Sequence, residues 1–147
     1  MRFAEFAVGQ VLRAGPLSVL ANDVIAFATA FDPQPFHIDS DSATHSRWGG
    51  LIASGWHTCA LAMRMVSVGL LQGSDSMGSP GLAYLRWPTP VRPGDRLRLE
   101  AHVLHAAPSS SGRVGVLRWR WIVLNQHDLP VLDTEVTSLF DLAQKSR

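Results

Sequence analysis

The sequence predicts an α+β domain in which a curled antiparallel β-sheet wraps around one long central α-helix. Residues 52–70 form an apolar run in which Arg64 is the only charged residue, and such a run is typical of a helix that packs inside a protein. Beyond residue 81, apolar residues recur with a period of two, which is typical of strands with one exposed face. A helix followed by several such strands predicts a helix on one face of a sheet.

The N-terminal part is predicted to hold a short strand, at residues 8–12, and then a helix. Asn22 and Asp23 can start the helix, because their side chains cap N–H groups and a negative charge is favourable there. Pro33 and Pro35 end it, since a residue that precedes proline disfavours the helical conformation. Apolar residues fall at helical spacing between these signals, at Val24, Phe27, Ala28 and Phe31.

The middle of the chain is predicted to be a long ordered loop that leads into the central helix. The loop covers residues 32–50, with a short helix near residues 40–46. The central helix over residues 52–70 has no clean polar face, so we expect it to be buried nearly all round. Residues 72–81 are rich in glycine and serine, which indicates a flexible connection.

The C-terminal half is predicted to form the sheet. Four segments have strand character, three of them with strict alternation, and hairpin turns are expected at 109–112 and 125–128. The strands are expected at residues 82–87, 96–103, 115–123 and 133–140. An open sheet of this kind leaves an edge or a face exposed, and homodimerisation is a common way to cover it.

Composition limits the possible classes of protein. The 147 residues are 46% hydrophobic, which predicts one folded domain over residues 1–147. A net charge of +1 argues against a protein that binds nucleic acid through phosphate contacts. Cys59 is the only cysteine, and neither a signal peptide nor a membrane span is evident, so we expect a cytoplasmic protein. Four of the six histidines, His45, His102, His105 and His127, form no plausible set of metal ligands.

The most informative segment combines a carboxylate, an imidazole and a glycine. Asp32 and His37 lie in a proline-stiffened loop with four residues between them, and Gly55 follows near the start of the apolar helix. An acid/base pair beside a helix N-terminus is suited to chemistry next to a carbonyl group. Taken alone, Asp32 would more simply be a turn residue and His37 a core histidine.

Three blocks of this chain resemble the MaoC-like hydratases and dehydratases of the hot-dog superfamily. Residues 32–39, DPQPFHID, are similar to the family pattern D-x-N-P-x-H-x-D. Residues 48–56, WGGLIASGW, are similar to F-G-x-x-I-A-H-G-M, and residues 85–95 end in a turn like P-V-x-x-G-D. The chain departs from the family at Gln34, where asparagine is usual, and at Ser54, where histidine is usual.

The resemblance implies a hot-dog fold and the reversible hydration of trans-2-enoyl-CoA to (R)-3-hydroxyacyl-CoA. It implies that Asp32 and His37 hold a catalytic water and that the Gly55 N–H stabilises the thioester oxygen. The substrate is an acyl-CoA or acyl-carrier thioester, no metal or redox cofactor is needed, and a homodimer or higher homo-oligomer is expected. The residues expected to contact substrate, which could equally serve the core or the surface, are Phe36, Trp48, Ser54, Trp56, Tyr84, Arg86 and Trp87.

Two other functions remain open at this point: a hot-dog thioesterase and a non-catalytic acyl-CoA binding protein. Such thioesterases commonly carry an acidic residue on the central helix, and residues 55–71 contain none, which favours hydration. Other polar residues in the region have simpler interpretations. We expect Asp39 to cap a loop or helix, His57 to be structural and Cys59 to be an inert core thiol.

Overall fold

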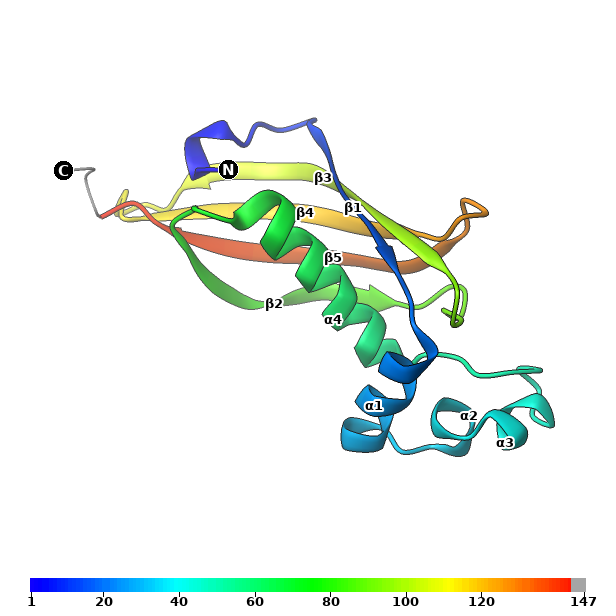
Figure 1. Ribbon diagram of the computed structural model, residues 1–147. Coiled ribbons are helices and arrows are strands. Elements are labelled where there is room, and N and C mark those ends of the chain that lie inside the picture. Colours follow the sequence, from blue (N-terminus) through cyan, green and yellow to red (C-terminus); the bar gives the residue numbers. More distant parts are fainter. Residues whose placement is uncertain (144–147) are drawn as a thin grey trace.

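The computed structural model describes residues 1–143 and shows five antiparallel strands curled around one long helix (Figure 1). The strand order in the sheet is β1-β3-β4-β5-β2, so β1 and β2 are the two edges. The predicted α+β architecture is therefore confirmed. The strands are β1 (Val11–Ser18), β2 (Ser76–Arg86), β3 (Arg96–Pro108), β4 (Val114–Leu124) and β5 (Pro130–Asp141).

The three central strands follow the alternation seen in the sequence. In β4, Trp119 and Trp121 point into the core, whereas Arg118 and Arg120 lie on the outer face. Strands β3 and β5 alternate in the same way, and both predicted hairpin turns connect the expected strands. One face of the sheet is therefore apolar, and it is this face that receives the helix.

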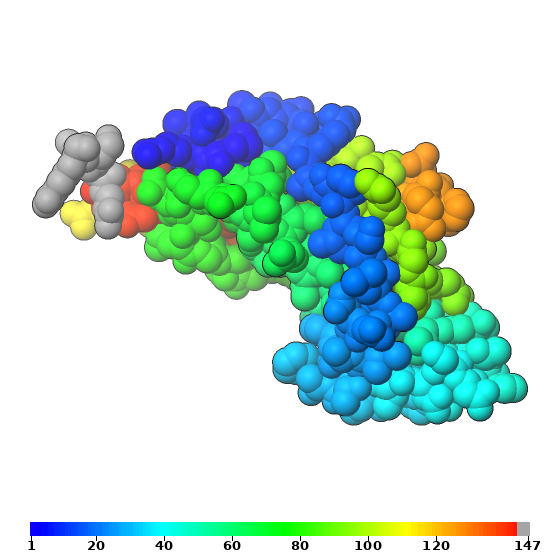
Figure 2. Space-filling view, viewed as in Figure 1, coloured from blue at the N-terminus to red at the C-terminus, as the bar shows by residue number. Residues whose placement is uncertain are grey.

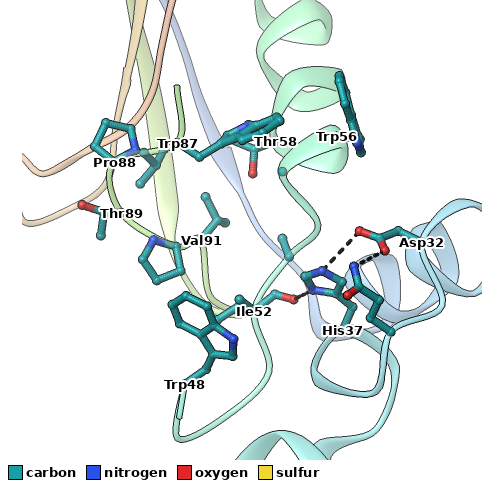
Figure 3. A pocket seen from close by; sticks show the side chains of 15 residues that line it. Asp32, His37, Trp48, Ile52, Trp56, Thr58, Trp87, Pro88, Thr89 and Val91 are labelled. Atoms are coloured by element: carbon teal, nitrogen blue, oxygen red, sulfur yellow. Dashed lines mark hydrogen bonds and ion pairs between the residues drawn. The ribbon is translucent and has the colours of Figure 1, made fainter. Parts of the chain in front are cut away.

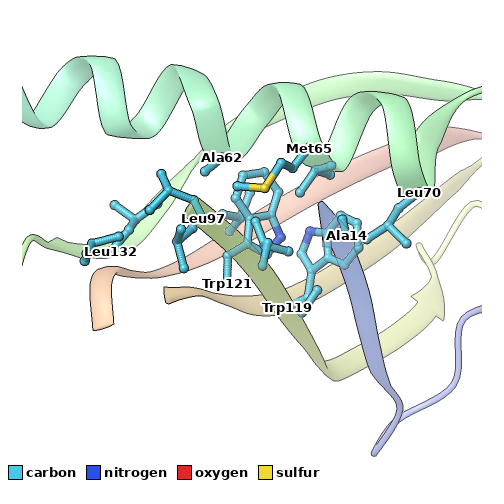
Figure 4. Close-up of a cluster of buried hydrophobic side chains, with 14 of the residues drawn as sticks. Ala14, Ala62, Met65, Leu70, Leu97, Trp119, Trp121 and Leu132 are labelled. Carbon is cyan, nitrogen blue, oxygen red and sulfur yellow. The ribbon is translucent and has the colours of Figure 1, made fainter. Parts of the chain in front are cut away.

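The core lies between the concave face of the sheet and α4 (Gly55–Val66) (Figure 4). Met65 and Ala62 of α4 face Trp119, Trp121 and Leu97 of the sheet. Most of these side chains are completely or almost completely buried. Burial of a large apolar side chain contributes about 1.5–3 kcal/mol, so this interface is a main source of stability.

Both edge strands differ from the sequence predictions. Strand β1 begins and ends later than predicted, and its register shifts between Ala14 and Leu17. Strand β2 starts at Ser76, inside the glycine- and serine-rich segment predicted to be flexible. Its register against β5 shifts repeatedly, and Gly78 and Gly81 have positive φ angles. Backbone pairing with β5, rather than a side-chain pattern, makes this segment a strand, and for that reason the composition was misleading.

Three helices precede α4 and lie together beyond one end of the sheet (Figures 1 and 2). Helix α1 (Ala21–Phe31) is close to the prediction. Leu20 occupies its N-cap and no side chain caps it, so the capping role expected of Asn22 and Asp23 is wrong, whereas Asp23 does place a negative charge in the first turn. The predicted loop contains α2 (Pro35–Ile38) and α3 (Ser40–Thr44). Asp39 accepts hydrogen bonds at the start of α3, as expected of a cap.

Helix α4 is buried on one side only. His57, Thr58, Ala62, Met65 and Val66 are buried, but Trp56 is 60% exposed and Met63 is 42% exposed. The expectation that this helix is covered nearly all round is therefore wrong. A π-helical turn, η2 (Ser67–Leu71), continues α4, and a short 3-10 turn, η1 (Phe3–Glu5), stands near the N-terminus. Within residues 1–143, no helix combines the length and apolarity that crossing a membrane requires.

Candidate active site

The site lies where α1, α2 and the head of α4 meet the loop that follows β2 (Figure 3). A cavity of about 350 Å³ opens there. One side of the cavity is polar, and the opposite side is aromatic. The cavity is lined by Asp32, Gln34, His37, Trp48, Ile52, Ala53, Gly55, Trp56, Thr58, Val131 and residues 87–91.

Asp32 and His37 form a pair at this cavity. Asp32 is the C-cap of α1, and His37 belongs to α2, whose first residue is Pro35. His37 Nε2 lies 3.2 Å from Asp32 Oδ2, and the two side chains are 6% and 18% exposed. The prolines thus separate two helices so tightly that both side chains face the same point.

The orientation of the His37 ring is set by its other nitrogen. His37 Nδ1 lies 2.6 Å from the carbonyl oxygen of Ile52. A carbonyl can only accept, so Nδ1 carries the hydrogen of this bond. Nε2 is therefore the nitrogen that faces Asp32 and the cavity (Figure 3). When neutral, this tautomer offers a lone pair at Nε2, and when protonated it forms an ion pair with Asp32.

Both oxygens of the Asp32 carboxylate receive hydrogen bonds. Gln34 Nε2 donates to Oδ1 at 2.7 Å, and Ser54 Oγ donates to Oδ2 at 2.7 Å. The bond from Gln34, then that from Ser54 and then the charge of His37 lower the pKa of Asp32, and partial burial opposes them. Asp32 is therefore a carboxylate near neutral pH.

Gly55 is the first residue of α4, and its Cα is covered by the Trp87 indole. A Cβ added at Gly55 would lie 2.6 Å from Cε2 of Trp87, closer than real side chains approach. The residue before it, Ser54, makes no side-chain cap bond to the helix. The first N–H groups of a helix have no partner within it, so the head of α4 offers backbone donors at the cavity.

Aromatic side chains form the opposite wall of the cavity. Trp56 and Trp87 meet edge to face with ring centroids 5.3 Å apart. Trp48 lies across the cavity, and Arg92 holds its segment by donating from Nη2 to the Trp48 carbonyl oxygen at 2.6 Å. Cys59 of α4 lies nearby, and burial raises the pKa of its thiol. The wall is suited to hold an apolar group next to the Asp32–His37 pair.

Four residues expected to contact substrate lie outside the cavity lining. Phe36 packs against the edge of the His37 ring, with centroids 4.4 Å apart, and Ser54 is completely buried. Tyr84 and Arg86 lie on β2, where the Tyr84 hydroxyl donates to Asp133 and the Arg86 guanidinium covers the Tyr84 ring. The structure therefore brings Trp48, Trp56 and Trp87 to the cavity and leaves Phe36, Ser54, Tyr84 and Arg86 around it or elsewhere.

His57 has surroundings that fit the structural role expected of it. Its ring stacks on Phe27 at 4.7 Å, and burial lowers its pKa although Asp23 opposes this. Within residues 1–143, no three His, Cys, Asp or Glu side chains are grouped so that they could hold a metal ion.

The hydrogen bonds that orient the pair were not evident in the sequence. The Ile52 carbonyl and the Ser54 hydroxyl are far from their partners along the chain, Ser54 being 22 residues from Asp32. No local pattern signals such a contact. Gln34 lies only two residues from Asp32, and an amide side chain at that distance in a loop is a recognisable signal.

A curled antiparallel sheet around one long helix is the hot-dog fold, and here an Asp–His pair lies at the head of that helix. Comparison with known proteins is specific about the family. Residues 3–117 match the family model described as "MaoC like domain". The chain belongs to this MaoC-like family.

Individual relatives agree with this assignment. The chain is 31% identical over 139 residues to the uncharacterized protein YdeM of Bacillus subtilis, covering 95% of this chain and 98% of YdeM. The structure is similar to a MaoC-like dehydratase from Rhodospirillum rubrum, with TM-score 0.85, 37% identity and coverage of 98% and 97%. It is also similar to the R-hydratase PhaJ1 from Pseudomonas aeruginosa, with TM-score 0.72, 26% identity and coverage of 99% and 93%. Family and neighbours support hydratase or dehydratase activity in general.

Proposed function

We propose that this protein is a hydro-lyase that interconverts a trans-2-enoyl thioester and the corresponding (R)-3-hydroxyacyl thioester. The observation that carries the proposal is the Asp32–His37 pair, 3.2 Å apart at a cavity that also reaches Gly55 at the head of α4. The (R) configuration is inferred from similarity to the R-hydratase from Pseudomonas aeruginosa. Asp32, His37 and Gly55 are the proposed catalytic residues.

The pair can hold a water molecule and move its proton. In the proposed hydration, a water molecule in the cavity contacts both the Asp32 carboxylate and His37 Nε2, which are themselves 3.2 Å apart. His37 Nε2 takes one proton as the water oxygen bonds to C3 of the enoyl group, and the C2=C3 electrons move toward the thioester oxygen. The imidazolium then returns a proton to C2, so both residues end in their starting states. Asp32 stays ionised throughout, because its two hydrogen-bond donors lower its pKa.

The negative charge on the thioester oxygen needs a donor that is already in place. The Gly55 N–H is at the start of α4, where helical N–H groups lack internal partners and the helix dipole is positive. A preorganised donor of this kind contributes about 3 kcal/mol to transition-state stabilisation. The absence of a side chain at Gly55 lets the thioester approach the backbone.

The substrate proposed here is an acyl thioester carried by coenzyme A or by an acyl-carrier protein. Trp48, Trp56 and Trp87 line the cavity and would contact the apolar part of this substrate. The reaction as written moves only protons and water, so it requires neither a metal ion nor a redox cofactor. Residues 55–71 hold no carboxylate that could assist hydrolysis in the manner of a hot-dog thioesterase.

Crotonyl-CoA provides the direct test of the function. Hydration removes the enoyl thioester absorbance without releasing thiol, whereas hydrolysis releases free coenzyme A that a thiol reagent detects. We expect loss of absorbance without thiol release. Thiol release alone would identify a thioesterase, and binding without either change across short, medium and branched enoyl-CoAs would identify a binding protein. Both of these outcomes contradict the proposal.

The site assignment is tested with Asp32→Asn and His37→Ala. Each is expected to lower kcat by about 10²-fold to 10⁴-fold, the usual contribution of a positioned acid or base, while the circular dichroism spectrum stays unchanged. Asp41 of α3 and His45, the C-cap of that helix, supply a matched control, because they are an exposed Asp–His pair 3.7 Å apart. Asp41→Asn and His45→Ala should leave kcat unchanged. Full activity in either site variant would overturn the assignment.

A further inference from the structure

Two of the positions at which this chain departs from the family motif, Gln34 and Ser54, meet at a single carboxylate. Gln34 donates to Oδ1 of Asp32 and Ser54 donates to Oδ2, both at 2.7 Å. The two donors reach Asp32 from different parts of the chain, one from the loop before α2 and the other from the segment before α4. They approach different oxygens, so neither can substitute for the other.

The hydrogen bond to Asp32 is the contact that the Ser54 hydroxyl makes in this structure. Its side chain is completely buried and does not line the cavity, so it cannot touch a substrate there. It stands at the N-cap of α4, where a serine side chain ordinarily bonds to the helix, yet it makes no such bond. Its hydroxyl is instead directed to Asp32. The sequence-based expectation that Ser54 contacts substrate is therefore replaced by a role behind the cavity.

We propose that Ser54 and Gln34 are positioning residues that act as a pair, holding the Asp32 carboxylate in the one orientation that faces His37 Nε2. We call these two hydrogen bonds, from Gln34 and from Ser54 to Asp32, the clamp. The expected effect of the clamp on kcat rests on the proposed hydration, whereas the clamp itself does not. With one donor on each oxygen, the carboxylate plane cannot rotate without breaking a bond. A carboxylate that kept only one donor would turn more freely, and a water held by it would be less well aligned with the substrate.

The clamp also affects the charge of Asp32. Hydrogen bonds to the ionised form favour that form, and both donors lower the pKa of Asp32. The titratable group that faces Asp32 is His37 on α2, and its charge acts in the same direction. Removal of either donor should therefore raise the pKa of Asp32, and the acidic limb of the rate profile should move to higher pH.

The test uses Ser54→Ala, Gln34→Met and the double variant in the full chain. Ser138→Ala is the control for loss of a buried hydroxyl, because Ser138 accepts a hydrogen bond from Trp119 in the core, away from the site. Two properties are measured: the pKa of Asp32 by carbon-13 NMR of its carboxyl group, and kcat with KM for crotonyl-CoA. Ser54→Thr keeps the hydroxyl and tests for rescue.

Each single variant is expected to raise the pKa of Asp32 and to lower kcat about tenfold, with KM nearly unchanged. The double variant should lose little more kcat than the worse single one, because both donors restrain the same carboxylate. Ser54→Thr should restore most of kcat, and Ser138→Ala should change neither property.

Unchanged Asp32 pKa values in both single variants would overturn the clamp, and so would multiplicative losses of kcat. Gln34 is exposed, so Gln34→Met keeps the proposal testable if Ser54→Ala fails to fold. A protein that hydrates no enoyl thioester would contradict the proposed function. The clamp would still be judged by the carboxyl titration.

Discussion

Gly55 has two separate roles, one through its backbone N–H group and one through the absence of a side chain. Its backbone N–H is the proposed donor to the thioester oxygen, and its missing side chain leaves room for Trp87. The steric demand alone would explain a glycine here, because a Cβ would lie within 3 Å of three indole atoms. A substitution at Gly55 therefore has to be separated into a packing effect and a catalytic effect.

The double change Gly55→Ala with Trp87→Leu makes this separation. Gly55→Ala alone should lower kcat roughly tenfold to hundredfold, because the indole must shift into the cavity and displace the thioester. Adding Trp87→Leu relieves the overlap and should recover part of that kcat. Steady-state kinetics of wild type, Gly55→Ala, Trp87→Leu and the double variant measures both effects. Wild-type kcat in Gly55→Ala would argue that neither the close packing nor the backbone approach matters.

The local part of the site was predictable from residues alone, and the long-range part was not. Asp32 and His37 are near neighbours in a proline-stiffened loop, so their convergence follows from short-range geometry. The contact of Ser54 with Asp32 depends on how α4 docks against α1 and α2. Sequence spacing carries no information about that docking, and for this reason Ser54 was expected to meet substrate rather than Asp32.

At the scale of elements, strands β2, β4 and β5 are joined on their outer face by a charged network. Arg120 of β4 donates to both oxygens of Asp133 of β5, at 2.9 and 2.8 Å, and the Tyr84 hydroxyl of β2 donates to the same carboxylate. Arg120 lowers the pKa of Asp133 most, and burial together with Asp133 raises the pKa of Tyr84. This network occupies Tyr84 in the sheet and explains its absence from the cavity.

Asp133→Asn should lower the free energy of unfolding by about 1 kcal/mol at pH 7, a typical value for a partly exposed cross-strand pair. Because the folded-state pKa of Asp133 is lowered, its stabilisation is present above the unfolded-state pKa of about 3.9 and is lost as the pH falls below it. Urea unfolding at several pH values checks this. A difference from wild type that grows as the pH falls would contradict it.

The central strands were predictable and the edge strands were not, for a physical reason. Strands β3, β4 and β5 have one buried face, which imposes strict alternation on their side chains. Strand β2 is exposed along most of its length, and its glycines allow the irregular register that the pairing with β5 requires. A strand without a buried face does not need alternating apolar and polar residues, so its sequence carries no period-two pattern that could predict it.

At the scale of the whole molecule, apolar side chains remain exposed on α4 and on the β2 edge. Trp56 and Met63 of α4 are exposed, as are Met77 and Leu82 of β2. An edge strand with exposed apolar residues is a surface that pairing with a second chain can cover. The homodimer or higher homo-oligomer expected from the sequence stays a prediction, and we propose that this surface forms its interface.

Replacement of Met77 and Leu82 by lysine tests the dimer. We expect wild-type protein to have the mass of a dimer in light scattering after size-exclusion chromatography, and the double lysine variant to shift toward the monomer, because charge at an edge opposes pairing. Val8→Lys is a suitable control, since Val8 is exposed but lies outside the sheet and α4. Monomeric wild-type protein at micromolar concentration would contradict the prediction.

The four residues from Ile52 to Gly55 join the separate parts of the site through hydrogen bonds. The Ile52 N–H is bonded to Phe36 and its carbonyl to His37, the Ala53 N–H is bonded to Val91, and Ser54 holds Asp32. This segment therefore connects three parts of the site: it hydrogen-bonds to the His37 imidazole and the Asp32 carboxylate, and it leads directly into α4. Because these bonds couple the three groups, we expect the imidazole, the carboxylate and the head of α4 to keep their relative positions whichever molecule enters the cavity.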